Sequence, residues 1–105
     1  MRRVELSAND WSVSAFLATS LVDRLLGTFR VPPGAGLVIR TRSVHSFGQT
    51  EPMTILGLDA GMRVVAAGEL LPNRIAFLPS ARVIVELPSD HSVPSMNDLV
   101  EMTDG

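Results

Sequence analysis

Apolar and polar residues alternate in short runs along most of the chain, and a period of two residues is typical of half-buried β-strands. The clearest example lies at residues 81–87, where Val83 and Val85 point to one face and Ile84 and Glu86 point to the other. Other runs predict strands at residues 2–6, 11–16, 36–40, 44–47, 53–58, 63–67 and 69–71, and Leu99, Val100 and Met102 favour a short terminal strand.

One segment follows helical spacing instead, with apolar side chains at Leu21, Val22, Leu25 and Leu26. Thr19 or Ser20, directly before it, is suited to cap the first turn of a helix. Asp23 falls in that turn, and Gly27 occupies a position where helices commonly end. The sequence therefore predicts one short helix near the N-terminus, which the prolines within residues 31–36 would not allow to continue.

Short strands separated by turn signals are typical of small all-β folds. The loop of residues 59–62 contains Asp59 and Gly61 between two β-rich runs, and it predicts a hairpin. We therefore expect a mainly β fold, either a small antiparallel β-sandwich or a barrel-like domain, with the one short helix. A chain of 105 residues has the length of a single domain, which we place at 1–105.

The composition changes at Pro88. Residues 89–105 contain four acids and no arginine or lysine, and Pro94, Ser95 and Asn97 favour a loop. We expect this acidic C-terminal segment to lie outside the core, so that removing residues 95–105 leaves the domain folded.

The composition also excludes several functions. The chain has no cysteine, so it forms no disulfide, thiolate metal site or cysteine nucleophile. A net charge of −2 does not favour a broad electropositive surface, and we expect no nucleic-acid partner. No apolar run follows Met1, Arg2 and Arg3 as in a signal peptide, and no run is long enough to span a bilayer. We expect a cytoplasmic protein without a membrane partner.

Four polar residues are candidates for ligand binding: His45, Glu51, Arg74 and Glu86. His45 lies in an apolar strand, where a histidine acts as a base or ligand, or else hydrogen-bonds the backbone and fixes the following loop. If strands bring Arg74 and Glu86 together, an ion pair is the simplest outcome; otherwise Arg74 is free to bind a small anion. We assign no catalytic residue, because neighbouring strand residues such as His45 and Ser46 point to opposite faces.

Three further residues have simpler structural explanations. Asp59 is suited to closing the predicted hairpin through its own backbone, and Trp11 is suited to anchoring the core or a sheet edge. His91 would be needed with His45, Glu51 and Asp59 to build a metal site, but their spacings match no compact ligand motif. We therefore expect no metal and no cofactor.

An ordered series of short motifs is more specific than any single residue. Its parts are S-V-H-S-F-G at residues 43–48, Pro52, L-D at 58–59, Gly61, V-V at 64–65, L-P-N-R at 71–74 and V-E-L-P at 85–88, preceded by Asp23, Arg24, Gly27 and Arg30. Over about residues 11–88 the chain resembles domain-of-unknown-function family 192 of bacteria and archaea. The resemblance implies a small β-sandwich or barrel-like fold and brings no established activity. Gln49 and Thr54 depart from it, standing where the family usually has methionine and aspartate.

Two functions follow as hypotheses. The first is a non-enzymatic binding or interaction module for a protein partner or a small ligand, suggested by the missing catalytic constellation and by Thr54 in place of the acid. The alternative is a small hydrolase-like or ligand-processing enzyme centred on His45, Glu51 and Arg74. A pocket with converging titratable groups would favour the enzyme, whereas an exposed apolar patch or an unpaired strand edge would favour the module.

Overall fold

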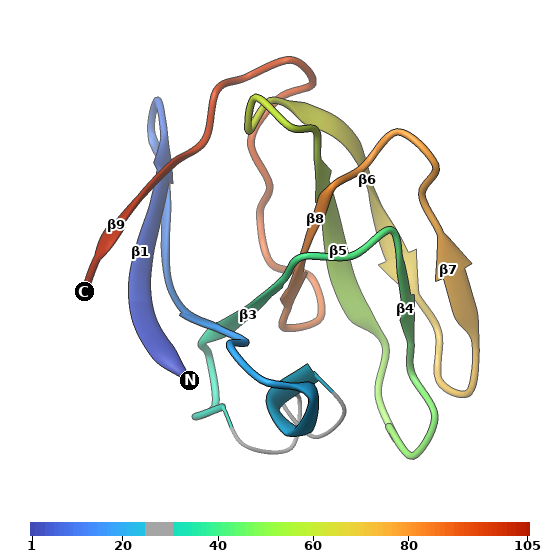
Figure 1. Ribbon diagram of the computed structural model, residues 1–105. Helices are drawn as coiled ribbons and strands as arrows, with labels where there is room; N and C mark the ends of the chain where they lie inside the picture. The colour runs from blue at the N-terminus through green and yellow to red at the C-terminus, as the bar shows by residue number, and fades with distance from the viewer. Residues whose placement is uncertain (25–30) are drawn as a thin grey trace.

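Strands make up nearly all of the regular structure, which confirms the mainly β prediction (Figure 1). The computed structural model describes residues 1–24 and 31–105. Within these residues the strands are β1 (Arg2–Ala8), β2 (Trp11–Leu17), β3 (Gly36–Ile39), β4 (Ser43–His45), β5 (Met53–Leu58), β6 (Val64–Leu70), β7 (Ile75–Phe77), β8 (Val83–Leu87) and β9 (Glu101–Asp104).

Seven of these strands form one sheet in the order β6-β5-β8-β3-β2-β1-β9. Neighbouring strands are antiparallel except β2 and β3, which run parallel with Ala15 opposite Gly36. Parallel neighbours need a long connection, and residues 18–35 provide one between β2 and β3. The sheet is therefore mixed, which corrects the expectation of a purely antiparallel fold.

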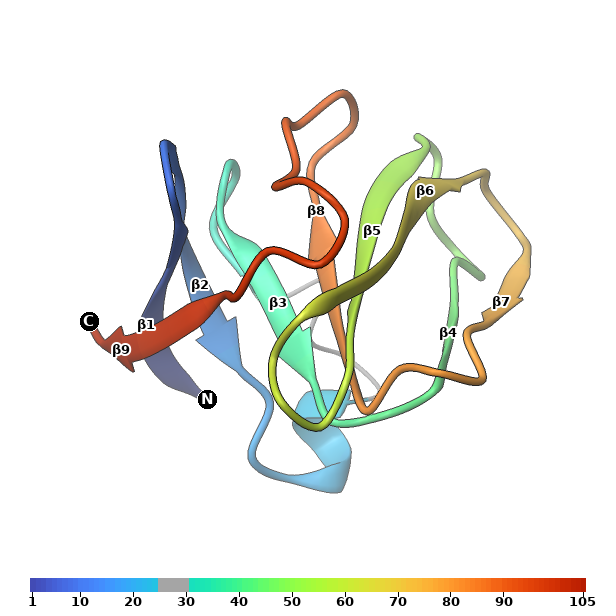
Figure 2. The same cartoon turned by 90° about the horizontal axis from the view of Figure 1, so that it is seen from above.

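The sheet is strongly curled, and its edge strands β9 and β6 are linked by the segment that precedes β9 (Figure 2). The segment before β9 reaches the start of β6, where Arg63 and Leu99 form an isolated antiparallel bridge. The N–H of Val64 donates to Asp98 O at 3.0 Å, and the N–H of Val100 donates to Met62 O at 2.9 Å. These bonds close the sheet into a barrel-like shape.

Two cores lie on the two faces of this curled sheet. The inner core fills the barrel and takes one face of each long strand: Val4, Leu6, Val13, Leu17, Val38, Leu56, Leu58, Val64, Val85, Leu87 and Val100 are among its buried members. Trp11 belongs to this core. It donates its indole N–H to Ser92 O at 2.7 Å, and this hydrogen bond anchors the C-terminal part of the chain to the core.

The second core lies outside the barrel, beneath a two-stranded antiparallel ladder formed by β4 and β7. We call residues 42–49 and 71–78 the flap. Val44 and Ala76 of the flap pack toward the outward side chains of the central strands, among them Ile55 and Ile84. Gly57 of β5 lets the end of the flap lie close, since a Cβ at this position would come within 2.9 Å of Leu78 Cδ1.

The predicted helix starts at Leu21, where Ser20 acts as its cap by accepting a hydrogen bond from Asp23 N at 3.1 Å. The helix comes after β1 and β2, so the expectation that it lies near the N-terminus was wrong. Its predicted continuation through Leu25, Leu26 and Gly27 lies outside the described residues.

The strand predictions differ from the structure mainly around the flap. The sequence divides residues 63–71 into two strands, whereas the structure has the single strand β6, which passes through the exposed Gly68. The pattern of apolar residues does not predict β7, because this strand has three residues and follows a turn in which Asn73 adopts a positive φ of 57°. Such short segments carry little periodicity.

The C-terminal segment belongs to the core, so the expectation that it lies outside the core is wrong, and we now expect residues 95–105 to be needed for folding. Val100 is 1% exposed, and the same segment supplies β9 and the closing hydrogen bonds. Ending the chain at residue 94 should lower the melting temperature by more than about 10 °C or abolish cooperative unfolding, because it opens the barrel. Thermal unfolding followed by circular dichroism measures this.

Substitutions at two neighbouring residues test the packing of the C-terminal segment without shortening the chain. Val100→Ser should cost about 2 kcal/mol or more of unfolding free energy, whereas Leu99→Ser, at a side chain that is largely exposed, should stay within about 0.5 kcal/mol. Equal melting temperatures for the two variants would mean that Val100 does not hold the barrel closed.

Candidate functional site

A groove runs along the outer face of the barrel, between the flap, the start of the helix and the loop of residues 31–35. It consists of two adjoining pockets of about 240 and 230 Å³ that share Gln49 and Glu86. The first pocket lies beside β4 and is lined by Leu21, Arg24, Ile39, Thr41, Ser43, Val44, His45 and Phe47 in addition to the shared pair. The second is lined mainly by prolines and apolar side chains, with Glu51 among them.

Glu86 is the most unusual residue of this groove. It lies in β8 between two other strands, in register with Leu37 of β3 and Ile55 of β5, and it is only 6% exposed. Its side chain leaves the sheet on the outward face, the same face as Ile84. A buried carboxylate needs polar partners, and Glu86 has an interaction within the chain. The structure thus places an acid where the surrounding strands supply apolar residues.

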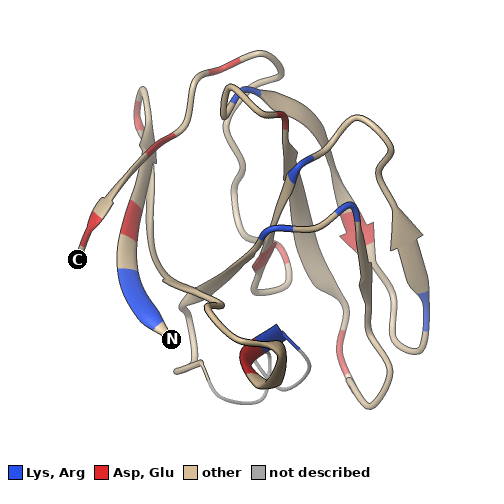
Figure 3. Cartoon of the chain, in the orientation of Figure 1, with Lys and Arg blue, Asp and Glu red and all other residues tan. Residues whose placement is uncertain are grey.

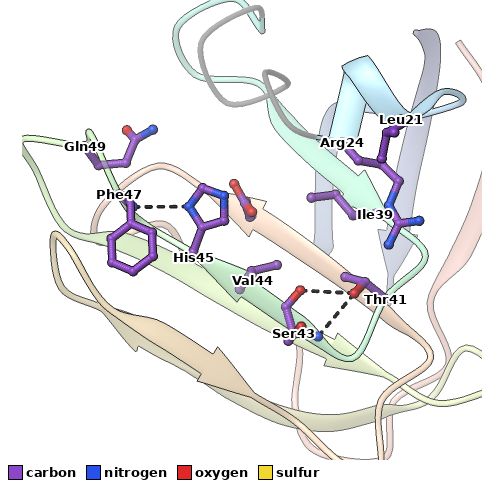
Figure 4. A pocket seen from close by; sticks show the side chains of 10 residues that line it. Leu21, Arg24, Ile39, Thr41, Ser43, Val44, His45, Phe47 and Gln49 are labelled. Carbon is purple, nitrogen blue, oxygen red and sulfur yellow. Dashed lines mark hydrogen bonds between the residues drawn. The ribbon is translucent and has the colours of Figure 1, made fainter.

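His45 lines the first pocket from β4 (Figure 4). Its ring stacks on Phe47 with centroids 5.2 Å apart, and its Nδ1 accepts a hydrogen bond from Phe47 N at 3.3 Å. This contact is the loop-fixing role that the sequence offered as one interpretation of His45. It leaves Nε2 as the ring nitrogen available to a ligand.

Ser46 points to the opposite face from His45, as expected for neighbouring strand residues. Its side chain is fully buried; its hydroxyl donates to Leu71 O and accepts from Arg74 N at 2.8 Å. Ser46 N also donates to Arg74 O at 2.8 Å. We call Ser46 and residues 71–74 the clasp, because these bonds join the two halves of the flap. The hydroxyl is committed to this structural role.

The remaining two candidates lie apart from each other. Glu51 is exposed at the second pocket, so it shares that pocket with Glu86. Arg74 lines neither pocket, and its guanidinium donates to Asn73 O at 3.3 Å. Arg74 and Glu86 therefore do not form the ion pair that the sequence suggested, because β7 pairs with β4 and not with β8.

The residues considered for a metal site are also separate. Asp59 closes the β5–β6 hairpin as predicted, accepting hydrogen bonds from Gly61 N at 2.9 Å and Arg63 N at 3.0 Å. His91 packs edge-on against Trp11. Among residues 1–24 and 31–105, no group of three or more histidines and acids is placed to hold a metal ion.

The structure adds Arg24 and Gln49 to the candidates. Arg24 reaches the first pocket from the helix, close to Thr41 in Figure 4, and Gln49 follows the clasp. Arg24 belongs to the motif series that carries the family resemblance, but its position beside β4 follows only from the folded chain. Gln49 stood out in the sequence, since it replaces the methionine that is usual at this position in the family that the chain resembles.

Asp23 holds the helix start against the end of β2. Asp23 Oδ2 accepts hydrogen bonds from Thr19 N at 3.2 Å and from the Thr19 hydroxyl at 3.1 Å. The backbone bond from Thr19 is the main cause that lowers the pKa of Asp23 below its ordinary value of 3.8, against the opposing effect of burial. The helix that presents Arg24 to the groove is thus anchored by an ionised carboxylate.

Fold and groove together define a small barrel-like β domain with a lateral groove beside a two-stranded flap. Solved structures share the fold. A protein of unknown function from Novosphingobium aromaticivorans DSM 12444 has a TM-score of 0.74 at 15% identity, over 94% of this chain and 83% of its own. A protein from Sinorhizobium meliloti 1021, provisionally described as a transcription regulator, has a TM-score of 0.73 at 17% identity, over 96% and 92%.

Identities this low show a common fold and do not carry a function across. No protein family model matches the sequence, and no curated protein matches it either. In the part of the chain that the structure describes, no helix has the length and apolar character needed to cross a bilayer.

Ser46→Ala should destabilise the domain by about 1–3 kcal/mol, because it removes the hydroxyl that makes part-buried hydrogen bonds with Leu71 O and Arg74 N. Urea unfolding measures the change. Ser43→Ala is the matched control, since this exposed hydroxyl makes no hydrogen bond to the described residues, and it should stay within about 0.5 kcal/mol. Equal effects of the two variants would contradict the clasp.

The lowered pKa of Asp23 predicts a pH-dependent contribution to stability. A carboxylate with a depressed folded-state pKa stabilises the fold above its unfolded-state pKa, and this contribution disappears as the pH falls through the folded-state pKa. Asp23→Asn should therefore melt below the wild type near neutral pH and converge with it in strong acid. Asp10→Asn, at an exposed carboxylate, should have the melting temperature of the wild type at every pH. If the melting temperature of Asp23→Asn stays equally far below that of the wild type in acid, the ionised Asp23 carboxylate does not stabilise the fold.

Proposed function

We propose that the chain is a small non-enzymatic binding domain whose ligand lies in the groove beside the flap. The observation that carries this proposal is Glu86, a carboxylate at 6% exposure on a central strand that lines both pockets. A buried acid is costly compared with an apolar residue of similar size, so a carboxylate kept at such a position is a candidate for ligand binding.

The two carboxylates of the groove suit a small ligand that carries an amine. Glu86 lies where the two pockets join, and Glu51 adds a second carboxylate at the second pocket. A carboxylate accepts several hydrogen bonds, so a ligand ammonium group adds to the contact that Glu86 makes within the chain. Pro32, Pro33 and Pro52 offer apolar surface to the rest of the ligand.

We also propose that the chain is a divergent member of domain-of-unknown-function family 192. The support is that motif parts distant in sequence meet in the flap. Gly48 N donates to Asn73 Oδ1 at 3.3 Å, and Arg74 N donates to Ser46 Oγ. The S-V-H-S-F-G and P-N-R motifs thus form one structural unit.

One observation favours the enzymatic alternative: His45 and Glu86 are titratable groups that line the same pocket. Acid–base chemistry needs such groups within reach of a reacting atom. Against this stand the commitment of His45 Nδ1 to Phe47 N and of the Ser46 hydroxyl to the clasp. Binding without turnover is the function that these contacts support best.

The test is a calorimetric and thermal-shift screen of primary amines, amino sugars and amino acids, each paired with an uncharged alcohol or amide of the same shape. An amine that binds the folded state should raise the melting temperature, and its uncharged partner should not. Glu86→Gln should weaken binding roughly tenfold to a hundredfold, the expected effect of removing a charge-assisted hydrogen bond.

Glu69→Gln is the control, because Glu69 is exposed on β6 and lines neither pocket. Duplex DNA joins the panel because of the description given to the S. meliloti protein. If no amine binds, or if Glu86→Gln binds as well as Glu69→Gln, the proposed ligand class is wrong. Consumption of a bound compound, lost in His45→Ala, would establish the enzyme instead.

A further inference from the structure

The ladder between β4 and β7 has two outer edges, and its hydrogen-bond pattern defines which backbone groups face them. Arg42 O accepts from Leu78 N at 2.7 Å, and Ser46 N donates to Arg74 O at 2.8 Å. Backbone groups alternate along an antiparallel ladder, so those of Ser43 and His45 point outward on β4. Those of Ile75 and Phe77 point outward on β7 in the same way.

The outer edge of β4 is engaged by its own side chains (Figure 4). The Thr41 hydroxyl donates to Ser43 O at 3.0 Å and accepts from Ser43 N at 3.2 Å. His45 Nδ1 accepts from Phe47 N. This edge also faces the first pocket, where Arg24 and Leu21 stand across from it. These contacts leave little room for another strand.

The outer edge of β7 has no comparable protection among the described residues. No described group hydrogen-bonds the outward N–H or C=O groups of Ile75 and Phe77. Their side chains are 66% and 65% exposed, and they share one face of the ladder with His45. An unpaired edge that carries exposed apolar side chains is a template for an additional strand.

The charge of the flap indicates which charged residues an added strand would carry. Residues 42–49 and 71–78 include Arg42, His45 and Arg74 and no acid, although the whole chain has a net charge of −2. Arg42 and Arg74 lie just beyond the two ends of the ladder. Figure 3 shows no acidic position on β4 or β7, while acids lie on several barrel strands. Glu51 and Glu69 are the nearest acids along the sequence.

We propose that β7 binds an extended segment of a partner protein, which pairs with its outer edge and carries apolar residues at alternate positions between acidic ends. The apolar side chains pack on Ile75 and Phe77, and the acids meet Arg42 and Arg74. A second copy of this chain fits less well, because its own β7 brings Arg74 and no acid to the contact. This surface is separate from the groove, which lies on the other side of β4.

The test uses a synthetic peptide, Glu-Asp-Val-Thr-Val-Thr-Val-Asp-Glu, acetylated and amidated, titrated into the full chain labelled for NMR. Binding should shift the amide signals of Ile75 and Phe77 and protect both from hydrogen exchange. A peptide with lysine in place of each acid should bind at least about tenfold more weakly. A peptide N-methylated on the amides that face β7 should lose a similar factor, which tests strand pairing without altering the protein.

Matched variants separate the parts of the contact. Phe77→Ala should weaken binding about tenfold, and Phe77→Pro, which also removes the outward N–H, should weaken it further. Arg74→Gln should reduce affinity, while Arg2→Gln, on the distant β1, should not. No binding of the acidic peptide, equal binding of the lysine peptide, or a dimer in sedimentation that Phe77→Ala dissociates would each overturn the proposal. Loss of amine binding in the groove would leave these results unchanged.

Discussion

The central strands of the sheet are apolar on both faces, and the rest of the structure follows from the need to cover both. In β8, Val85 belongs to the inner core and Ile84 to the outer one. Closing the barrel buries only the inner face. The flap buries part of the outer face, and its strands are too short to cover all of it. The uncovered part is the groove in which Glu86 lies, so a polar site arises where the second layer ends.

The alternation of apolar residues was enough to predict the long strands and the Asp59 hairpin, since both depend on neighbours in sequence. Three features were beyond it. The parallel pairing of β2 and β3 depends on where residues 18–35 lead the chain. The closing contact depends on where residues 98–100 lie in the fold, since their backbone partners are Met62 and Val64, far earlier in the chain. The strand β7 is defined by its pairing with β4 and by nothing in its own three residues.

The candidate site was partly predictable for a related reason. His45 and Glu86 stand out because each is a polar residue in an apolar strand, and the structure places both beside one pocket. Whether Arg74 meets Glu86 was open in the sequence, because register between distant segments is not encoded locally. Arg24 reaches the groove only through the packing of the helix. Ser46 was noticed as a neighbour of His45, but its role in joining the flap required knowledge of where residues 71–74 lie.

The unequal edges of the flap have a consequence for self-assembly. A two-stranded ladder with two open edges could stack copy on copy without limit, as in a cross-β fibre. Here Thr41 and His45 engage backbone groups along β4, and the helix start stands opposite. A strand that pairs with β7 therefore extends the ladder on one side only, because the edge of β4 on the other side is already engaged. The flap behaves as an end piece: it accepts one neighbour and stops the growth of any filament there.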